Sequence, residues 1–343
     1  MNHKFISIIG AAALAIGFAP HSDACTGMEL KTKNGEVVMA RTIEWSGSDM
    51  NTFYVVVPKA YTPDTKYAFT GVAVELPQYI MEGVNEKGLS AGLFYFPDYG
   101  KYEEEANGKT SVSDFELVGY ILSRCATIDE VKSTIAGLHI HGIDPRSSTV
   151  HWRFIEESGR QVVLEIIDGK QVFYENTLGV LTNSPSFDYH LTNLNNYVNL
   201  MPGRAGANTI GRLEMTSFSG GTGMLGLPGD FSSPSRFVRV AFLQNTAPVR
   251  ETALETVTQA FHLLNNFDIP IGMQFAKGEE VVDIPSAAHV TVASDLSGHK
   301  LYFRTMHNCE IRCIDLNRIN FKKTGYVCKP LDKVKAETIH QIF

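Results

Sequence analysis

The chain has 343 residues, of which 44% are hydrophobic and 20% charged, and its formal net charge is −7. This apolar fraction is typical of a globular protein with a buried core, and it excludes wholesale disorder and collagen-like repetition. Lys and Arg number 30 against 37 Asp and Glu, with no basic block, which excludes the charge pattern of a nucleic-acid-binding protein.

The first 24 residues have the layout of a secretory signal. A short basic start at residues 1–4 precedes an apolar run at residues 5–18, and small residues follow at positions 22 and 24. The run is shorter than the roughly 20 residues that span a bilayer, so we expect no stable membrane anchor. We therefore expect cleavage after Ala24, export of the protein, and a single domain over residues 25–343.

After residue 24 the chain alternates between strand and helix patterns. An Asn34-Gly35 turn predicts a hairpin that pairs residues 26–30 with residues 37–42. Further strands are expected at 53–57, 68–74, 79–84, 89–96, 149–155, 161–167, 171–174, 179–182, 289–294, 300–305 and 310–315. Helices are expected at 117–125 and 127–138, behind capping-box patterns that begin at Ser113 and Thr127, and at 187–198, 236–244 and 251–264. This order favours two antiparallel sheets covered by helices.

Cleavage after Ala24 makes Cys25 the first residue of the exported chain. A lipid anchor, a reactive nucleophile and a bystander thiol are three explanations for an odd cysteine in such a protein. An N-terminal cysteine carries a nucleophile and a base together, because its α-amine has a pKa of about 7.7–8.0 and can accept the thiol proton. Ser22 and Asp23 do not fit a lipoprotein signal, which favours the nucleophile.

The remaining cysteines and two close histidines have simpler interpretations. An even set of four cysteines can pair as disulfides in an oxidising compartment; they are Cys125, Cys309, Cys313 and Cys328. Cys309 and Cys313 have the spacing of a ligand pair, and His139 and His141 can share a strand face, but no further partner stands at metal-ligand spacing. We expect no metal and no cofactor.

Four polar residues are candidates for a site around Cys25. Arg41 lies on the strand that the hairpin pairs with Cys25, where it can lower the pKa of the thiol, and Glu44 follows at the strand end. Asn183 offers an amide donor that can hold an oxyanion. Arg236 begins a helix after a loop rich in Gly, Pro and Ser. Each also has an ordinary interpretation, as an edge ion pair, a turn-forming asparagine or a surface arginine.

Together, five ordered sequence blocks resemble the choloylglycine hydrolase family, which contains bile salt hydrolases and penicillin V acylases. The blocks are Cys25-Thr26, Arg41-Thr42-Ile43-Glu44, Glu82 to Leu89, Leu181 to Leu194 and Leu227 to Phe237. The resemblance covers nearly the whole chain after residue 24, with Glu44 where many relatives have aspartate. It implies an α+β protein with the αββα four-layer sandwich of the N-terminal-nucleophile hydrolases, and it suggests a homotetramer.

The resemblance also implies a catalytic role for each matching residue. Cys25 attacks an amide carbonyl and forms a thioester, Arg41 supports the thiolate, and Arg236 completes the charged surroundings. Asn183 supplies one oxyanion donor, and the second falls at Phe94 or Tyr95, depending on the end from which that segment is counted. Only Tyr95 has a side-chain donor, so we expect Tyr95; a backbone N–H serves if Phe94 is the match.

The substrate follows less directly from the resemblance. Trp45, Phe94 and Phe96 can line an acyl pocket, although core packing is the expected alternative. Export and the Glu44-Trp45 pair resemble periplasmic Gram-negative members, and Tyr95 favours aryl-acyl or fatty-acyl amides over conjugated bile acids. We expect a small-molecule amide, cleaved by an enzyme of the penicillin V acylase or bile salt hydrolase type. The alternatives are an N-acyl-homoserine lactone acylase, a silent exported binding protein, or a lipoprotein anchored at Cys25.

Overall fold

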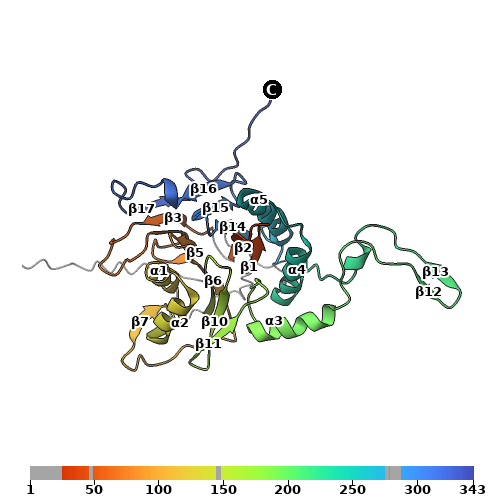
Figure 1. The fold of residues 1–343 in the computed structure, drawn as a ribbon, viewed down its shortest axis with the longest axis horizontal. Helices are drawn as coiled ribbons and strands as arrows, with labels where there is room; N and C mark the ends of the chain where they lie inside the picture. Colours follow the sequence, from red (N-terminus) through yellow and green to blue (C-terminus); the bar gives the residue numbers. More distant parts are fainter. Residues whose placement is uncertain (1–24, 46–48, 144–147, 275–277, 279–286) are drawn as a thin grey trace, which may run out of the picture.

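The computed structural model describes residues 25–45, 49–143, 148–274, 278 and 287–343, so the signal predicted over residues 1–24 lies outside the described residues. Two large antiparallel sheets form the body of the protein (Figure 1). The five-stranded sheet contains, in spatial order, β1 (Cys25–Lys31), β2 (Val37–Trp45), β14 (Ala287–Asp295), β15 (Lys300–Thr305) and β16 (Arg312–Asp315). The eight-stranded sheet contains β11 (Lys170–Glu175), β10 (Gln161–Ile167), β9 (Val150–Ile155), β6 (Ser90–Tyr95), β5 (Ile80–Asn85), β4 (Phe69–Val74), β3 (Thr52–Val57) and β17 (Val327–Pro330).

Helices cover the outer face of each sheet. The longer pair, α4 (Ser233–Thr246) and α5 (Ala253–Leu264), packs on β1, β2 and β14 of the five-stranded sheet. The shorter pair, α1 (Leu117–Leu122) and α2 (Ile128–Ala136), packs on β5, β6 and β9 of the eight-stranded sheet (Figure 1). The order helix, sheet, sheet, helix is the four-layer αββα sandwich that the family resemblance implied.

The alternation of side chains along β2 divides the buried core into two clusters. Val37, Met39 and Ile43 point to one face and join the cluster shared by both sheets, whereas Val38 and Ala40 point to the other face and pack beneath α4 and α5. Successive residues of a strand face opposite sides, so a nine-residue strand buried on both faces needs an almost continuous apolar run. Arg41 and Glu44 interrupt that run in β2 and are nevertheless buried.

The strand and helix predictions are largely confirmed, with three corrections. The predicted strand at 179–182 is wrong: only an isolated bridge joins Leu181 to Gly27. The capping pattern at Ser113 is also wrong, because α1 begins behind Glu116 with no side-chain cap, whereas Thr127 caps α2 by accepting a hydrogen bond from the Glu130 N–H. The sequence patterns missed β17 and four short strands, which are β7 (Thr110–Ser113), β8 (Leu138–His141), β12 (Asn208–Ile210) and β13 (Leu213–Met215).

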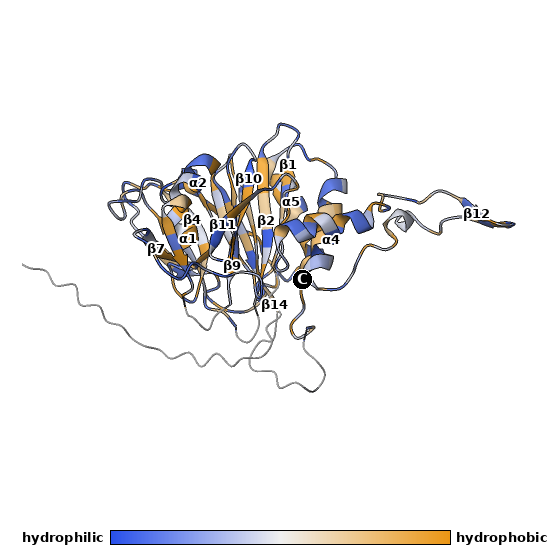
Figure 2. Cartoon of the chain, turned by 90° about the horizontal axis from the view of Figure 1, so that it is seen from below, coloured by the Kyte–Doolittle hydropathy of each residue, from blue (hydrophilic) through white to orange (hydrophobic). Residues whose placement is uncertain are grey.

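A long arm, residues 198–231, projects from the body between α3 (Phe187–Asn193) and α4, and carries β12 and β13 at its far end (Figures 1 and 2). Short 3₁₀ turns occur at η1 (Leu194–Tyr197), η2 (Thr222–Met224), η3 (Asn265–Phe267) and η4 (Leu316–Arg318). Six large apolar side chains of the arm are exposed: Val198, Met201, Ile210, Leu213, Phe218 and Leu225. Across the described part of the chain, no helix has the length and apolar character needed to span a bilayer.

Candidate active site

Cys25 begins β1 at the edge of the five-stranded sheet and is almost completely buried. The isolated bridge between Gly27 and Leu181 sets an antiparallel register on the free edge of β1. Counting two residues back from Gly27 and two residues forward from Leu181, this register places Asn183 directly across from Cys25. The Cys25 N–H donates to Asn183 Oδ1 over 2.6 Å. A single backbone bridge therefore brings together two residues that are 158 positions apart in the sequence.

Arg236, in the first turn of α4, ties these two residues to each other. Its Nη1 donates to the Cys25 carbonyl over 2.5 Å and to Thr26 Oγ1 over 2.8 Å, and its Nη2 donates to Asn183 Oδ1 over 2.9 Å. The Nε donates to the Phe231 carbonyl over 2.8 Å, so the guanidinium is held from both sides. The helix carries Pro234 at its start, where a missing N–H is tolerated. Arg236 follows in the same turn, and its side chain reaches the end of β1.

The hydrogen bonds around Asn183 determine which way its amide points. Cys25 N–H and Arg236 Nη2 are both donors, so Oδ1 must face them. On the other side, Nδ2 donates to the Tyr95 carbonyl over 2.8 Å. An NH₂ group has two hydrogens, so this contact leaves one for another acceptor. The predicted oxyanion donor therefore lies beside Cys25 with one N–H to offer.

Arg41 lies beside Gly27 in the β1–β2 ladder and points between the two sheets. It is completely buried, donates to the Leu93 carbonyl over 2.5 Å, and lies 3.7 Å from the centre of the Phe94 ring. Its Nη1 is also 3.6 Å from a carboxylate oxygen of Glu82, itself fully buried. Arg41 is thus an inter-sheet ion-pair and cation–π partner, and the edge ion pair considered from the sequence does not describe it.

Burial raises the pKa of the Cys25 thiol, and the positive charges of Arg41 and Arg236 offset that rise only in part. Arg41 therefore acts in the expected direction, but it does not leave a depressed thiol pKa. A thiol that keeps its proton needs a base at the moment of attack. The nearest group of that kind in an N-terminal cysteine is its own α-amine, at the position where Cys25 N contacts Asn183.

Glu44 is buried beside the same arginines. Burial raises the pKa of its carboxyl group to about 8, against the opposing charges of Arg236 and Arg41. Neither carboxylate oxygen has a hydrogen-bond partner among the described residues. Glu44 thus lies within the charged surroundings of Cys25, and its charge state changes near neutral pH.

The strand alternation of β6 separates Tyr95 from the aromatic residues on either side of it. Phe94 and Phe96 both contact the ring of His151, at ring centroid distances of 6.1 and 4.5 Å. Tyr95 lies between them and points its ring to the other face of the strand. The contact between Tyr95 and Asn183 is made by the Tyr95 carbonyl, which accepts from Asn183 Nδ2, and side-chain donation from Tyr95 stays a prediction.

The three predicted pocket aromatics divide in a similar way. Phe94 and Phe96 are fully buried, and they pack on Arg41 and His151 as core residues. Trp45 ends β2, and the prediction for its side chain lies outside the described residues. The core alternative therefore describes Phe94 and Phe96 better than an acyl pocket does.

The structure places the remaining cysteines and the two close histidines. All five cysteines are free thiols, so the disulfides that an even set allowed are not formed; Cys309 and Cys313 are exposed. His139 and His141 lie on β8 with stacked rings 5.7 Å apart. Across the described ranges, no group of three His, Cys, Asp or Glu side chains is arranged to hold a metal ion.

Polar residues that contact Arg41 and Asn183 were missed by the sequence patterns. Glu82 lies between Arg41 and Arg153, with oxygen–nitrogen distances of 3.6 and 3.8 Å, and accepts a hydrogen bond from Ser90 Oγ. Ser233 accepts from the Asn183 N–H over 2.9 Å. The available signal was a single Glu inside the otherwise uncharged strand β5, since an acid in such a run is buried or at an edge.

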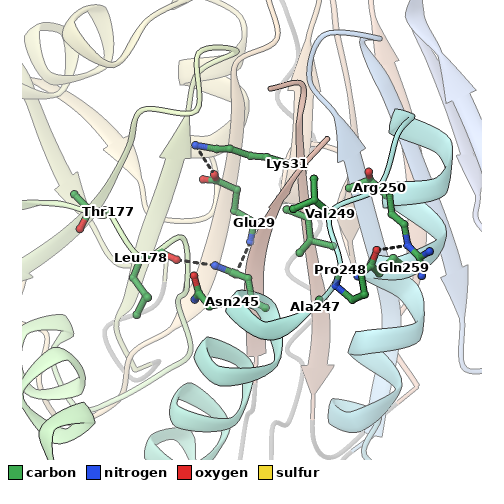
Figure 3. Close-up of a pocket in the computed structure, with 13 residues that line it drawn as sticks. Glu29, Lys31, Thr177, Leu178, Asn245, Ala247, Pro248, Val249, Arg250 and Gln259 are labelled. Carbon is green, nitrogen blue, oxygen red and sulfur yellow. Dashed lines mark hydrogen bonds and ion pairs between the residues drawn. The ribbon is translucent and has the colours of Figure 1, made fainter. Parts of the chain in front are cut away.

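A separate hollow of about 310 Å³ lies at the opposite end of β1, around Glu29 and Lys31 (Figure 3). A seven-residue strand spans roughly 20 Å, so this hollow is remote from Cys25. Its polar groups pair with one another: Lys31 with Glu29 over 3.0 Å, and Arg250 Nε with Gln259 over 2.6 Å. We assign it no part in the chemistry.

The αββα sandwich and the polar groups that converge on Cys25 place the chain among the hydrolases of linear amides. A model of the choloylglycine hydrolase family, described as linear amide C–N hydrolases, matches residues 25–329, and the chain belongs to that family. It is therefore an amidohydrolase acting on linear amides.

Relatives and solved structures agree with this assignment. The chain is 31% identical over 312 residues to a bile salt hydrolase/transferase of Clostridium perfringens, covering 86% of this chain and 93% of that protein. It is 30% identical over 319 residues to one of Lactiplantibacillus plantarum, covering 90% and 97%. A conjugated bile acid hydrolase variant from Clostridium perfringens superposes with a TM-score of 0.80 at 29% identity, covering 93% and 100%. A penicillin V acylase from Agrobacterium tumefaciens, 23% identical, shares the fold with a TM-score of 0.72, covering 90% and 91%.

Proposed function

We propose that the protein hydrolyses a small-molecule amide with Cys25 as an N-terminal nucleophile, after cleavage behind Ala24. The observation that carries this proposal is the position of the Cys25 nitrogen, which lies 2.6 Å from Asn183 Oδ1. Arg236 Nη2 donates to the same oxygen. Cleavage turns that nitrogen into a free amine on the same residue as the thiol. Arg236 and Asn183 then hold the amine and the carbonyl of Cys25 in a fixed orientation.

The proposed reaction has two steps that share the same groups. The α-amine of Cys25 accepts the thiol proton as Sγ attacks the substrate carbonyl, and the remaining N–H of Asn183 Nδ2 donates a hydrogen bond to the oxyanion. Collapse breaks the C–N bond, and the leaving amine takes the proton from the α-ammonium, which leaves a thioester on Cys25. Water, deprotonated by the same α-amine, then releases the acid and restores the thiol. Arg41 and Arg236 stabilise the transient negative charge on sulfur.

We propose a conjugated bile salt as the first substrate to test. The relatives that cover most of this chain at 30% identity or more include bile salt hydrolase/transferases from two organisms. The expectation of an aryl-acyl or fatty-acyl amide depended on a Tyr95 hydroxyl in the site, whereas the Tyr95 group that contacts Asn183 is its carbonyl. Penicillin V and a long-chain N-acyl-homoserine lactone are the comparison substrates.

Export to the periplasm is part of the proposal, because the amine of Cys25 exists only after the signal is removed. A lipid on Cys25 would modify both the base and the nucleophile, so a lipoprotein and this enzyme exclude each other. The intact mass of the exported protein distinguishes the two states. A mass that begins at Cys25 without an added lipid supports the enzyme.

We also propose that the protein assembles with copies of itself, as the family resemblance suggested with a homotetramer. The projecting arm supports self-association, because it exposes six large apolar side chains. Two of them, Ile210 and Leu213, lie on a two-stranded hairpin that is marginally stable alone. Light scattering on the purified protein measures the number of subunits. A monomer at micromolar concentration would contradict the assembly, without bearing on the chemistry at Cys25.

The decisive experiment measures amine release from glycocholate, penicillin V and a long-chain N-acyl-homoserine lactone. The protein is first verified by mass to begin at Cys25, and two controls accompany it: Cys25→Ala, and a form that keeps residues before Cys25. We expect turnover of glycocholate by the processed protein alone. Turnover by the uncleaved form would refute the α-amine as base, and turnover by Cys25→Ala would refute the nucleophile. A folded, processed protein inactive on all three would fit a silent binding protein.

A further inference from the structure

Thr182 and Asn183 lie in a segment that no sheet holds in place. The strand expected at 179–182 is absent, and the last backbone pairing before Asn183 is the bridge between Leu181 and Gly27. Buried backbone groups must nevertheless find hydrogen-bond partners. Beyond that bridge, the partners of this segment are side chains.

Two buried histidines supply the donors for the two carbonyls. His151 Nε2 lies 3.0 Å from the Thr182 carbonyl, and His190 Nε2 lies 2.8 Å from the Asn183 carbonyl. Both imidazoles are completely buried, and each is stacked on a phenylalanine ring: His151 on Phe96 at 4.5 Å, His190 on Phe237 at 4.6 Å. Stacking fixes the plane of each ring, so each N–H is aimed along one direction.

The two carbonyl partners determine which ring nitrogen of each histidine carries a hydrogen. A carbonyl oxygen can only accept, so each Nε2 must carry its hydrogen. His190 needs no second proton, and burial lowers its pKa to about 4, which keeps it neutral. His151 Nδ1 faces Glu165 Oε1 at 3.2 Å, and that oxygen also accepts from the Phe187 N–H at 2.9 Å. Glu165 therefore holds His151 by the second nitrogen of its ring.

We propose that His151 and His190 are positioning residues that hold the carbonyls of Thr182 and Asn183 and so aim the Asn183 amide at Cys25, with Glu165 fixing His151. The inference rests on the proposed function, since it assigns these residues to the oxyanion donor of that reaction. With Ser233 Oγ on the Asn183 N–H, the backbone of this residue is held at both its N–H and its carbonyl. Only the side-chain torsions remain, and Cys25, Arg236 and Tyr95 fix those.

A matched pair of substitutions at each histidine isolates the position of the donor. The amide nitrogen of Gln lies as many bonds from the backbone as the Nε2 of His, whereas that of Asn is one bond shorter. At His190 we expect His190→Gln to keep kcat close to wild type. His190→Asn leaves the Asn183 carbonyl without its donor, and we expect kcat to fall about tenfold to a hundredfold at unchanged KM, because the misplaced group acts in the transition state.

The same pair separates the two contacts of His151. Asn at this position can keep a contact with Glu165 and loses the Thr182 carbonyl, whereas Gln does the reverse. We expect His151→Gln to be the more active of the two. His139→Asn is the control, because His139 is also a buried histidine but contacts Ser111 Oγ and the Glu103 carbonyl. It lies on β8, in the small sheet that β8 forms with β7.

A merely structural role for these histidines would lower stability equally in Gln and Asn variants and leave kcat of the folded fraction unchanged. Equal kcat values for each Gln and Asn pair would therefore overturn the inference. Crystal structures of wild type and His190→Asn give an answer even if no substrate is turned over. We expect Asn183 to lose its contacts with Cys25 and Tyr95 in the variant; unchanged contacts would refute positioning by His190. An inactive wild type would contradict the proposed function alone.

Discussion

Replacing Arg236 with lysine tests whether the site depends on the shape of the guanidinium or only on its charge. The Nε bond to the Phe231 carbonyl and the Nη2 bond to Asn183 Oδ1 lie at opposite ends of the group, so one ammonium cannot make both. We expect two of the four hydrogen bonds to be lost. Hydrogen bonds to charged groups contribute about 1.5–3 kcal/mol each, so the free energy of unfolding should fall by roughly 3–6 kcal/mol.

The loss of activity follows from the two groups that Arg236 holds in place. Asn183 Oδ1 and the Cys25 carbonyl are the groups that Arg236 holds together, and misplacing catalytic groups by about 1 Å can lower the rate by about 10²-fold. We expect kcat/KM for the best substrate of the panel to fall by about that factor. Amine release at a temperature well below the unfolding transition measures it, and urea denaturation measures the stability.

Arg239 provides the matched control, because it lies one turn further along α4 and is also buried. Its guanidinium donates to the carbonyls of Pro228, Asp230 and Asn266 and contacts no residue of the site. Arg239→Lys should therefore lower stability and leave kcat/KM close to wild type. If both variants lose the same activity, or if Arg236→Lys loses none, Arg236 supports only the fold.

The neighbours of Cys25 that are close in sequence could be predicted, and the distant ones could not be predicted from local patterns. The turn at Asn34-Gly35 sets the register of the hairpin, and this register puts Arg41 beside Gly27 and Glu44 near Cys25. Arg236 is 211 positions from Cys25, and only the resemblance to a family brought it and Asn183 into the site. Long-range pairs of this kind depend on packing of whole elements, which a single sequence does not encode locally.

The faces on which Phe94 and Tyr95 lie could not be predicted, for a different reason. Strand alternation shows that adjacent residues face opposite sides, but not which side faces Cys25. That depends on the pairing of β6 with β5 and β9, which puts Phe94 over Arg41 and against Arg153. The prediction weighed side-chain donors and not faces, and so it favoured Tyr95, whose ring lies on the face opposite Phe94.

The thiol pKa was the other quantity that local reasoning could not give. The sequence places Arg41 near Cys25, and that charge does lower the pKa of the thiol. Complete burial raises it by more, and burial is set by the packing of both sheets around the end of β1. The same holds for Glu44, where burial outweighs two arginines.

Three further substitutions test separate parts of this site. Arg41→Lys should lower kcat/KM about tenfold or more, because lysine lacks the planar guanidinium that packs on Phe94 and the paired N–H donors that it presents. Wild-type rates in this variant would mean that Arg41 contributes only to packing. Gly27→Ala should destabilise the protein by about 1–3 kcal/mol, since a Cβ there would lie 2.9 Å from Phe94. Gly206→Ala is the control: a Cβ at that position would have no atom within 4 Å, so thermal unfolding should not change measurably. Glu44→Gln should change how stability depends on pH. The pKa of Glu44 is raised from 4.5 to about 8 in the folded state, so the native protein keeps this proton while the unfolded chain loses it. The resulting stabilisation is complete below pH 4.5, decreases as the pH rises, and is gone above pH 8, which amounts to about 5 kcal/mol at 1.36 kcal/mol per pH unit. Urea denaturation of both proteins between pH 4.5 and 9 should therefore show wild type losing stability relative to Glu44→Gln across this range, and a constant difference would mean that Glu44 is ionised throughout and paired with its arginines.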